Sequence, residues 1–294
     1  PPELIAQSPA VERKTSRLLH LETASGDITD RRFRDIAELM SAGDVMVFND
    51  SRVIPARLIA TKVDIDGKPA CQSTEETAGK LEILLLKRLE ANVWETLVKP
   101  ARRAKVGTVV QLITKKLKVI TTETQGNEKL KVKNLELKTD ELEPGKNLKI
   151  ITCEIIGIGE DGIRTVRFSN EELLAEMGEI PLPPYIHQPL ADKERYQTVY
   201  SRISGSVADP TAGLHFTPGL VDKLRNMGVE CLFVTLHVGL DTFRPVREED
   251  PLKHAIHREY GVLTPETAGR LSLAKAEGRR VISVGTTSMR LLEA

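Results

Sequence analysis

The sequence predicts an α/β domain with a mostly parallel sheet, divided along the chain by an inserted small all-β domain of barrel-like form. Two observations lead to this fold class. Helical and strand patterns alternate after residue 170, which is typical of a parallel sheet with crossover helices. Between residues 58 and 169 the chain has short runs, mostly rich in β-branched residues and separated by turns, as in small barrels and sandwiches. We therefore expect an α/β catalytic domain of residues 1–57 and 170–294, and an inserted domain of residues 58–169.

The first segment of the α/β domain contains one helical pattern and one strand pattern. Apolar residues recur at helical spacing from Asp30 to Met40, which predicts a helix there. Gly43 and Asp44 predict a turn, and the apolar run Val45–Phe48 predicts a short buried strand that ends before Asn49.

The inserted domain should be built from short strands joined by turns. We expect these strands at residues 62–65, 80–89, 93–98, 108–114, 118–124, 148–159 and 163–168. The polar stretch 121–149 alternates Leu and Val with charged residues, which favours a hairpin inserted in this domain, with a disordered loop as the alternative.

The second segment of the α/β domain should alternate helices and strands. We expect helices at 171–178, 220–228 and 265–278, and strands at 229–236 and 279–285. Thr217 and Pro218 precede the second helix, and Gly228 follows it, as residues of these types often do at helix ends. A last helix should begin at Thr286 or Thr287.

Composition and charge narrow the class of protein. Hydrophobic residues make up 40% of the 294 residues and charged residues 29%, which is ordinary for a globular protein. No apolar run approaches the ~20 residues of a membrane helix, so we expect no membrane partner. Cys71, Cys153 and Cys231 are odd in number and far apart, which favours a reducing cytoplasm over a disulfide framework. The balance of 42 basic and 42 acidic residues argues mildly against nucleic-acid binding but allows a local basic patch.

The most informative stretch lies between Ser204 and Val246, where two clusters of Gly, Thr, His and aromatic residues flank one predicted helix. Glycine lets a backbone approach a ligand, Thr and His supply hydrogen bonds, and Arg binds anions. Two such clusters favour two loops that converge on one pocket, although a turn with a core histidine would explain the first cluster equally well from residue types alone. The candidate residues are Thr211, Gly213, His215, Phe216 and Thr217 in the first cluster, and His237, Thr242 and Arg244 in the second.

Four further segments add candidate ligand contacts. Asn49, Arg52 and Arg57 follow the strand at 45–48, and the alternative is an Asx turn with two surface arginines. Tyr185 lies in the proline-rich segment GEIPLPPYI, where interdomain packing is the alternative, and Gln197 lies in ERYQTVY. Thr286 and Thr287 follow the strand at 279–285, where an ordinary strand-to-helix turn is the alternative.

Two segments concern metals and nucleic acid. HAIHREY places His254 and His257 on one helical face, but this spacing alone is weak and no cysteine lies nearby, so we expect no metal and favour a polar pocket wall. KPARRAK is the densest basic run outside the proposed pocket, and is either a solvated face or a phosphate-contacting patch. Its candidate tRNA-binding residues are Lys99, Arg102, Arg103 and Lys105.

Motifs along most of the chain resemble one family. They include GDVMVFNDSRVIPARL at 43–58, WETLVKPARRAKVGT at 94–108, PTAGLHFT at 210–217, TLHVGLDTFRPV at 235–246 and VISVGTTSMR at 281–290. These segments resemble the S-adenosylmethionine:tRNA ribosyltransferase-isomerase family of queuosine biosynthesis. The likeness is poor at about 111–170. Asp209 stands where the family usually has a small residue, and Asp241 where it usually has Gly.

The resemblance implies both a reaction and its partners. The ribosyl group of S-adenosylmethionine would be transferred and isomerised onto 7-aminomethyl-7-deazaguanine in tRNA, giving epoxyqueuosine-tRNA, adenine and methionine. S-adenosylmethionine would be a consumed co-substrate, and no cofactor would be needed. His215, His237, Thr211 and Thr217 would form the catalytic group. The resemblance also implies that the α/β domain continues beyond Ala294, and we expect a cytoplasmic monomer.

Two other functions remain open from the sequence. The departures at Asp209 and Asp241 would suit an RNA-binding protein that keeps the fold and lacks the chemistry. The motifs taken alone would also suit a hydrolase of small phosphorylated or nucleotide substrates.

Overall fold

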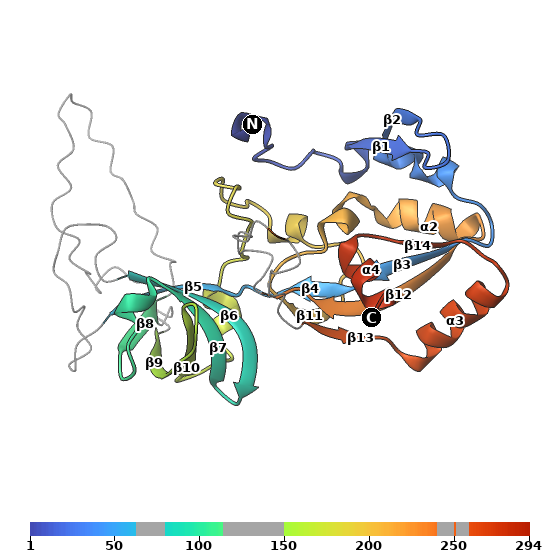
Figure 1. The fold of residues 1–294 in the computed structure, drawn as a ribbon. Coiled ribbons are helices and arrows are strands. Elements are labelled where there is room, and N and C mark those ends of the chain that lie inside the picture. The colour runs from blue at the N-terminus through green and yellow to red at the C-terminus, as the bar shows by residue number, and fades with distance from the viewer. Residues whose placement is uncertain (63–79, 114–149, 240–249, 251–258) are drawn as a thin grey trace, which may run out of the picture. The chain divides into compact units, whose positions relative to one another are not determined.

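The computed structural model describes residues 1–62, 80–113, 150–239, 250 and 259–294. The chain forms two compact units, one of residues 1–57 and 179–294 and the other of residues 58–178. Unit 1 contains the helices α2, α3 and α4 and unit 2 contains a barrel of β-strands (Figure 1). In the described part of the chain, no helix is long and apolar enough to cross a membrane.

The main sheet of unit 1 has four strands in the order β13-β12-β3-β14. The inner strand β3 (Val45–Asn49) is parallel to both of its neighbours, β12 (Glu230–His237) and β14 (Val281–Ser283). The edge strand β13 (Tyr260–Val262) is antiparallel to β12. The sheet is therefore mixed, and the carboxyl ends of β12, β3 and β14 lie at one edge.

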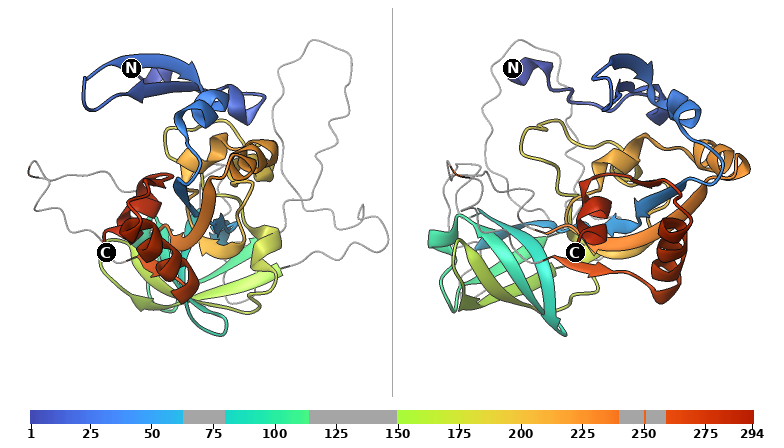
Figure 2. Two further views of the ribbon diagram at one scale, coloured as in Figure 1. Left: turned by 90° about the vertical axis from the view of Figure 1, so that its right-hand side faces the viewer. Right: turned by 45° about the vertical axis from the view of Figure 1, so that its right-hand side comes forward.

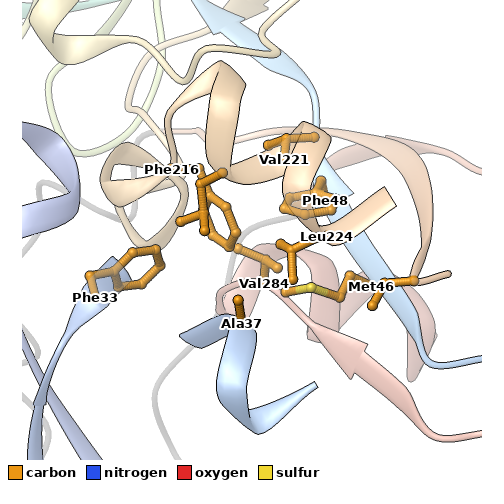
Figure 3. Close-up of a cluster of buried hydrophobic side chains, with 10 residues drawn as sticks. Phe33, Ala37, Met46, Phe48, Phe216, Val221, Leu224 and Val284 are labelled. Carbon is orange, nitrogen blue, oxygen red and sulfur yellow. The ribbon is translucent and has the colours of Figure 1, made fainter. Parts of the chain in front are cut away.

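One face of this sheet is covered by α2 (Pro218–Asn226) and the 3-10 helix η3 (Phe33–Leu39). Met46 and Phe48 of β3 point to this face and are fully buried in its apolar cluster (Figure 3). Phe216 is the central ring of the cluster, at 5.2 Å from the Phe48 ring in an edge-on arrangement. Burying side chains of this size contributes about 1.5–3 kcal/mol each, so this cluster is a main source of the stability of unit 1.

The opposite face is covered by α3 (Pro265–Ala276) and α4 (Thr286–Leu292), which lie on the other side of the sheet from α2 (Figure 2). Val45 and Val47 of β3 are fully buried here and pack near Ala274 of α3. Because both faces of β3 are covered, the strand is continuously apolar in sequence.

Smaller elements complete unit 1. β1 (Arg17–Leu21) and β2 (Ile28–Arg32) form an antiparallel hairpin that leads into η3. β4 (Ser51–Val53) follows β3 after one residue and pairs in parallel with β11 (Ile203–Ser206). This long-range pairing brings the segment around residues 203–209 beside the carboxyl end of β3.

Unit 2 contains a closed six-stranded barrel in the order β10-β7-β6-β5-β8-β9. Its strands are β5 (Arg57–Lys62), β6 (Lys80–Glu90), β7 (Val93–Lys99), β8 (Val109–Ile113), β9 (Ile150–Ile158) and β10 (Ile163–Phe168). Alternate side chains fill the interior, among them Leu58, Ile83, Val98 and Ile151, all fully buried. A short helix, α1 (Leu174–Met177), follows the last strand.

The structure confirms the predicted barrel and the predicted strands at 45–48, 80–89, 93–98, 148–159 and 163–168 within one or two residues at most ends. The helices expected at 220–228 and 265–278 and the strand at 229–236 are also confirmed. The strands expected at 108–114 and 279–285 are present in shorter form, as β8 and β14.

Two predicted helices are wrong in extent. Residues 30–32 belong to β2, because Asp30 pairs with Leu19 in the hairpin, and only the short η3 follows. The helix expected at 171–178 is limited to α1. The strand at 118–124, the hairpin at 121–149 and most of the strand at 62–65 lie outside the described residues.

Candidate active site

Three polar segments meet at the carboxyl edge of the main sheet of unit 1. β3 runs into Asn49 and Asp50, β12 ends at His237, and β14 is followed by Gly285. Ligands of open α/β sheets bind in the crevice outside the carboxyl ends of the strands. We therefore place the candidate site at this edge.

The side chain of Asn49 forms hydrogen bonds with the backbone of the neighbouring strand β12. Its side-chain oxygen accepts hydrogen bonds from the backbone N–H groups of Leu236 (3.0 Å) and Ser51 (3.1 Å). Its amide nitrogen donates to the carbonyl of Leu236 at 2.9 Å, and the side chain is buried. These bonds extend the pairing of β3 with β12. The structure thus gives Asn49 a structural role, and the substrate contact expected from the sequence stays a prediction.

Asp50 anchors the same edge through two partners. The hydroxyl of Thr235 donates to one carboxylate oxygen at 2.7 Å. Arg202 donates to the other oxygen through Nε (3.1 Å) and Nη2 (2.6 Å), and its guanidinium lies 5.2 Å from the ring centre of Phe233. The buried carboxylate is therefore paired, as a buried charge requires, and it joins β12 to the segment that begins β11.

The imidazole of His237 lies between a backbone and a ring. Gly205 passes so close that a Cβ atom on it would lie 2.9 Å from Cε1 of His237, and its φ of +145° also favours glycine. The Tyr260 ring stacks on the imidazole, with 6.3 Å between the ring centroids and 9° between the ring planes. Burial lowers the pKa of His237, and the negative charge of Asp50 opposes this shift. Among the described residues, its buried Nδ1 has no hydrogen-bond partner.

His215 ends the 3-10 helix η7 (Thr211–His215) and packs against Phe33 with 5.0 Å between ring centroids. Burial lowers its pKa, a hydrogen bond with the backbone of Arg13 raises it, and the positive charge of Arg13 lowers it again. Arg13 also donates to the carbonyl of Leu214 at 3.0 Å, which ties the N-terminal segment to η7. Both candidate imidazoles are thus held in the neutral form more firmly than a free histidine.

Other conspicuous residues of PTAGLHFT have structural roles. A Cβ atom on Gly213 would lie 2.1 Å from Oη of Tyr200, so this glycine makes room for a protein side chain instead of a ligand. Phe216 is 1% exposed in the apolar core. Thr217 caps α2, because its hydroxyl accepts from the backbone N–H of Leu220 at 3.2 Å. None of these arrangements supports the ligand contacts expected for Gly213, Phe216 and Thr217.

The first cluster nevertheless reaches the loop after β14. A Cβ atom on Gly285 would lie 3.2 Å from the Cβ of Ala212, so the two loops touch. Thr287 follows on α4, and its buried hydroxyl has no hydrogen-bond partner among the described residues. Motifs that are about 70 residues apart in the sequence are therefore neighbours at this edge.

Asp209 is a buried carboxylate in the loop between β11 and η7, with 5% exposure. Neither oxygen has a partner with hydrogen-bond geometry among the described residues. Burial raises its pKa to about 7, while the charge of Arg13 and the nearby backbone N–H of Thr198 act to lower it. This environment lets the carboxyl group change its charge close to neutral pH.

Most buried polar atoms without a partner belong to segments of this edge. Burying such an atom costs about 1–3 kcal/mol, so a group of them calls for a ligand or ordered water. Besides Nε of Arg31, they are Ser51 Oγ, Thr198 Oγ1, both Asp209 oxygens, His237 Nδ1 and Thr287 Oγ1 in the described part of the chain. Sequence reasoning missed Thr198 and Gly205, and only the glycine left a signal, as part of SGS.

Two other predicted contacts are occupied by protein partners. Gln197 is buried, and its amide pairs with the backbone of Val53 through both its oxygen (3.0 Å) and its nitrogen (2.9 Å). Arg52 donates to the hydroxyl of Ser201 at 3.0 Å and forms an ion pair with Glu194. Gln197 therefore has a structural role, while the partly exposed Arg52 pair could be exchanged for a ligand anion.

The remaining substrate candidates lie at the surface or outside the described residues. Arg57 is paired with Glu179, which also bonds to its backbone where the chain leaves and re-enters unit 1. Tyr185, Thr211 and Thr286 are exposed. Thr242 and Arg244, together with Asp241, lie outside the described residues.

The basic residues of KPARRAK lie at the end of β7 and in the 3-10 turn η4 (Ala101–Arg103) of unit 2. The side chains of Lys99, Arg102, Arg103 and Lys105 are exposed. Within the described part of unit 2, none of them forms an ion pair.

No three His, Cys, Asp or Glu side chains of the described residues are placed to hold a metal ion. His254 and His257 lie outside these residues. Glu259 of the same motif accepts from the backbone N–H of Gly239 at 3.2 Å and pairs with Arg290 at 2.8 Å, so it braces the end of β12 against α4.

The fold and the carboxyl edge of the main sheet define a class of protein, with an α/β unit that presents strand-end loops and a barrel unit with an exposed basic turn. A family model described as queuosine biosynthesis protein matches residues 1–294. The chain belongs to this family.

Curated relatives carry a more specific name. A protein from Dehalococcoides mccartyi (strain CBDB1), named S-adenosylmethionine:tRNA ribosyltransferase-isomerase, is 48% identical over 293 residues, which cover 100% of this chain and 73% of the relative. A protein of the same name from Clostridioides difficile (strain 630) is 44% identical over 297 residues and is covered to 74%. The solved structure of an S-adenosylmethionine tRNA ribosyltransferase from Thermotoga maritima is 30% identical, with 100% of this chain and 69% of that chain covered and a TM-score of 0.39.

Proposed function

We propose that this protein transfers and isomerises the ribosyl group of S-adenosylmethionine onto 7-aminomethyl-7-deazaguanine in tRNA. The products are epoxyqueuosine-tRNA, adenine and methionine, and S-adenosylmethionine is a consumed co-substrate. The names of the relatives support the reaction. The structural observation that carries the proposal is the group of unpartnered buried polar atoms at the carboxyl edge of the main sheet.

The reaction needs a base for a proton next to the sulfonium, and a hydrogen-bond donor or acid for the departing adenine. We assign the base to His237. Its imidazole is neutral because burial lowers its pKa, and its Nδ1 has no protein partner in the described part of the chain. The Gly205 backbone packs closely against the ring, and the Tyr260 ring lies parallel to it.

His215 is the second proton-transfer group in this proposal. Its bond with the backbone of Arg13 fixes the ring at the end of η7. The proposed ligand contacts are Thr211, Thr286, Thr287, Arg52, Arg57 and Tyr185, with Thr242 and Arg244 from outside the described residues. Exposed Lys99, Arg102, Arg103 and Lys105 are the proposed tRNA contacts, and the two compact units are the proposed domains.

The test is adenine release in single turnover, with and without tRNA that carries 7-aminomethyl-7-deazaguanine. The proposed enzyme releases adenine only with this tRNA. A hydrolase would release it without tRNA, and a non-catalytic RNA-binding protein would release none.

His237→Ala and His215→Ala should each slow this release by about 10²–10⁴-fold, the usual contribution of a proton-transfer group. His187→Ala is the matched control, because His187 is an exposed histidine of the same unit. Thermal melts establish that the variants are folded. Release at the wild-type rate in both variants would remove the two histidines from the mechanism.

A further inference from the structure

Arg164 is a charged residue at an interior position of the barrel. On β10 the buried side chains alternate, and Arg164 shares the inward face with Val166 and Phe168. It is only 7% exposed. A cation at such a position is costly unless hydrogen bonds satisfy it, so its retention indicates a specific task.

The guanidinium donates its hydrogen bonds to backbone carbonyls at one end of the barrel. Nε donates to the carbonyl of Ala104 at 2.7 Å, Nη2 to that of Ala101 at 2.8 Å, and Nη1 to that of Ile163 at 2.6 Å. The hydroxyl of Thr96 donates to the carbonyl of Arg164 itself at 3.1 Å, which fixes its backbone. Among the described residues Arg164 has no carboxylate partner, so its charge is not neutralised.

The segment that Arg164 holds is the basic turn η4. Ala104 is fully buried and Ala101 is half-buried, whereas the side chains between and after them point to solvent. A Cβ atom on Gly162 would lie 3.6 Å from the Cβ of Ala101, so the turn packs closely on the barrel end. The alanines and their carbonyls are thus directed inward, and Arg102, Arg103 and Lys105 are presented outward.

We propose that Arg164 is the positioning residue of a surface for the RNA phosphate backbone, formed by Arg102, Arg103 and Lys105. This rests on the proposed function, because that function makes tRNA the occupant. Three exposed cations without ion pairs in the described part of the chain suit a phosphate backbone, and the buried charge of Arg164 adds to their potential. Lys99 contributes less, because it lies opposite Glu82 in the β6–β7 pairing. The turn with Glu160 and Asp161, which contacts η4 through Gly162, limits the surface on one side.

The proposal is tested by binding of an unmodified tRNA transcript across a salt series. Each phosphate neutralised contributes about 0.7–0.9 to the slope of log affinity against log salt, or about 5–8-fold in affinity at 0.1 M salt. Arg102→Ala with Arg103→Ala should therefore lower the slope by about 1.4–1.8. Arg164→Met should produce a loss of similar size although this side chain touches no phosphate.

A double-mutant comparison separates positioning from general damage. In the chain that already lacks Arg102 and Arg103, Arg164→Met should cause little further loss of tRNA affinity, because both changes remove the same contacts. Arg167→Met is the matched control on the same strand, since Arg167 is exposed and paired with Glu154 at 3.2 Å. It should leave the salt slope unchanged.

If Arg164→Met does not fold, Arg164→Lys replaces it. A single ammonium keeps the charge but lacks the fork that holds Ala101 and Ala104 together. We expect weaker tRNA binding and a lower slope in this variant. Wild-type affinity and slope in folded Arg164→Lys or Arg164→Met would overturn the positioning role, and the same result in the Arg102/Arg103 variant would overturn the surface.

These outcomes are distinct from failure of the proposed function. A protein that binds tRNA through this surface but releases no adenine keeps the surface and loses the reaction. A protein that releases adenine normally while the Arg102/Arg103 variant binds tRNA like the wild type keeps the reaction and loses the surface.

Discussion

Replacing Asp209 with Asn should make the stability of unit 1 less dependent on pH. The Asp209 carboxyl is 5% exposed, and burial raises its pKa from the ordinary value of 3.8 to about 7. Between these two pH values the folded protein keeps a proton that the unfolded chain has lost. The free energy of unfolding therefore falls as pH rises through this window and levels off above about pH 7.

The size of the effect follows from the pKa difference. At about 1.36 kcal/mol per pKa unit, a difference of about 3 corresponds to about 4 kcal/mol between pH 4 and pH 8. Asparagine has the same shape and does not titrate, so the stability of Asp209→Asn relative to the wild type should increase by this amount over the same window. The folded protein could hydrate the ionised carboxylate, so 4 kcal/mol is an upper limit.

The assay is urea unfolding at several pH values between 4 and 8, followed by the helical circular dichroism signal. This signal reports on unit 1, because α2, α3 and α4 all belong to it. The control is Asp222→Asn, which changes an exposed carboxylate on α2. A stability difference between Asp209→Asn and the wild type that is constant from pH 4 to pH 8 would refute the assignment of a high pKa to this carboxyl.

Two further substitutions test structural roles at the same edge. Gly213→Ala should lower the free energy of unfolding by about 1–3 kcal/mol through overpacking, and Tyr200→Phe in the same chain should restore part of the loss, because the nearest clash, 2.1 Å, is with Oη of Tyr200. Unchanged thermal melts for Gly213→Ala would contradict this. Asn49→Ala should lower the free energy of unfolding, measured in urea, by about 2–4 kcal/mol, because it leaves buried backbone groups of Leu236 and Ser51 without their partner. A loss below about 1 kcal/mol would argue against the structural role of the Asn49 hydrogen bonds.

Local patterns in the sequence were sufficient for most elements of both units. Continuous apolar strands such as Val45–Phe48 and capped helices such as that at 218–226 depend on side chains that are near one another in the chain. The helix expected from Asp30 to Met40 failed for the opposite reason. Asp30 pairs with Leu19 in the β1–β2 hairpin, and this pairing outweighs the local helical pattern of apolar residues. The helix is therefore reduced to η3, which is about one turn shorter than predicted.

The sequence grouped the candidate site residues by type, and the structure shows which of them have protein partners. Asn49, Gly213, Phe216 and Gln197 were grouped with the ligand contacts because their residue types suit a site. In the structure each of them meets a protein partner, and the same amide or missing Cβ serves a backbone or a tyrosine. The residue type determines which groups a side chain can bond to, but only the folded structure determines which partner lies within reach.

The sequence alone determined the family, the barrel, and the two motif clusters that mark the edge of the sheet. These conclusions depend on the order of residues that are close together in the chain, which the sequence shows directly. Only the tertiary structure decided that β11 pairs with β4, that Gly205 and Tyr260 enclose His237, and that Asp209 is buried without a partner. Each of these features depends on contacts between segments that are distant in the chain. The burial of a side chain likewise depends on how all of these segments pack together.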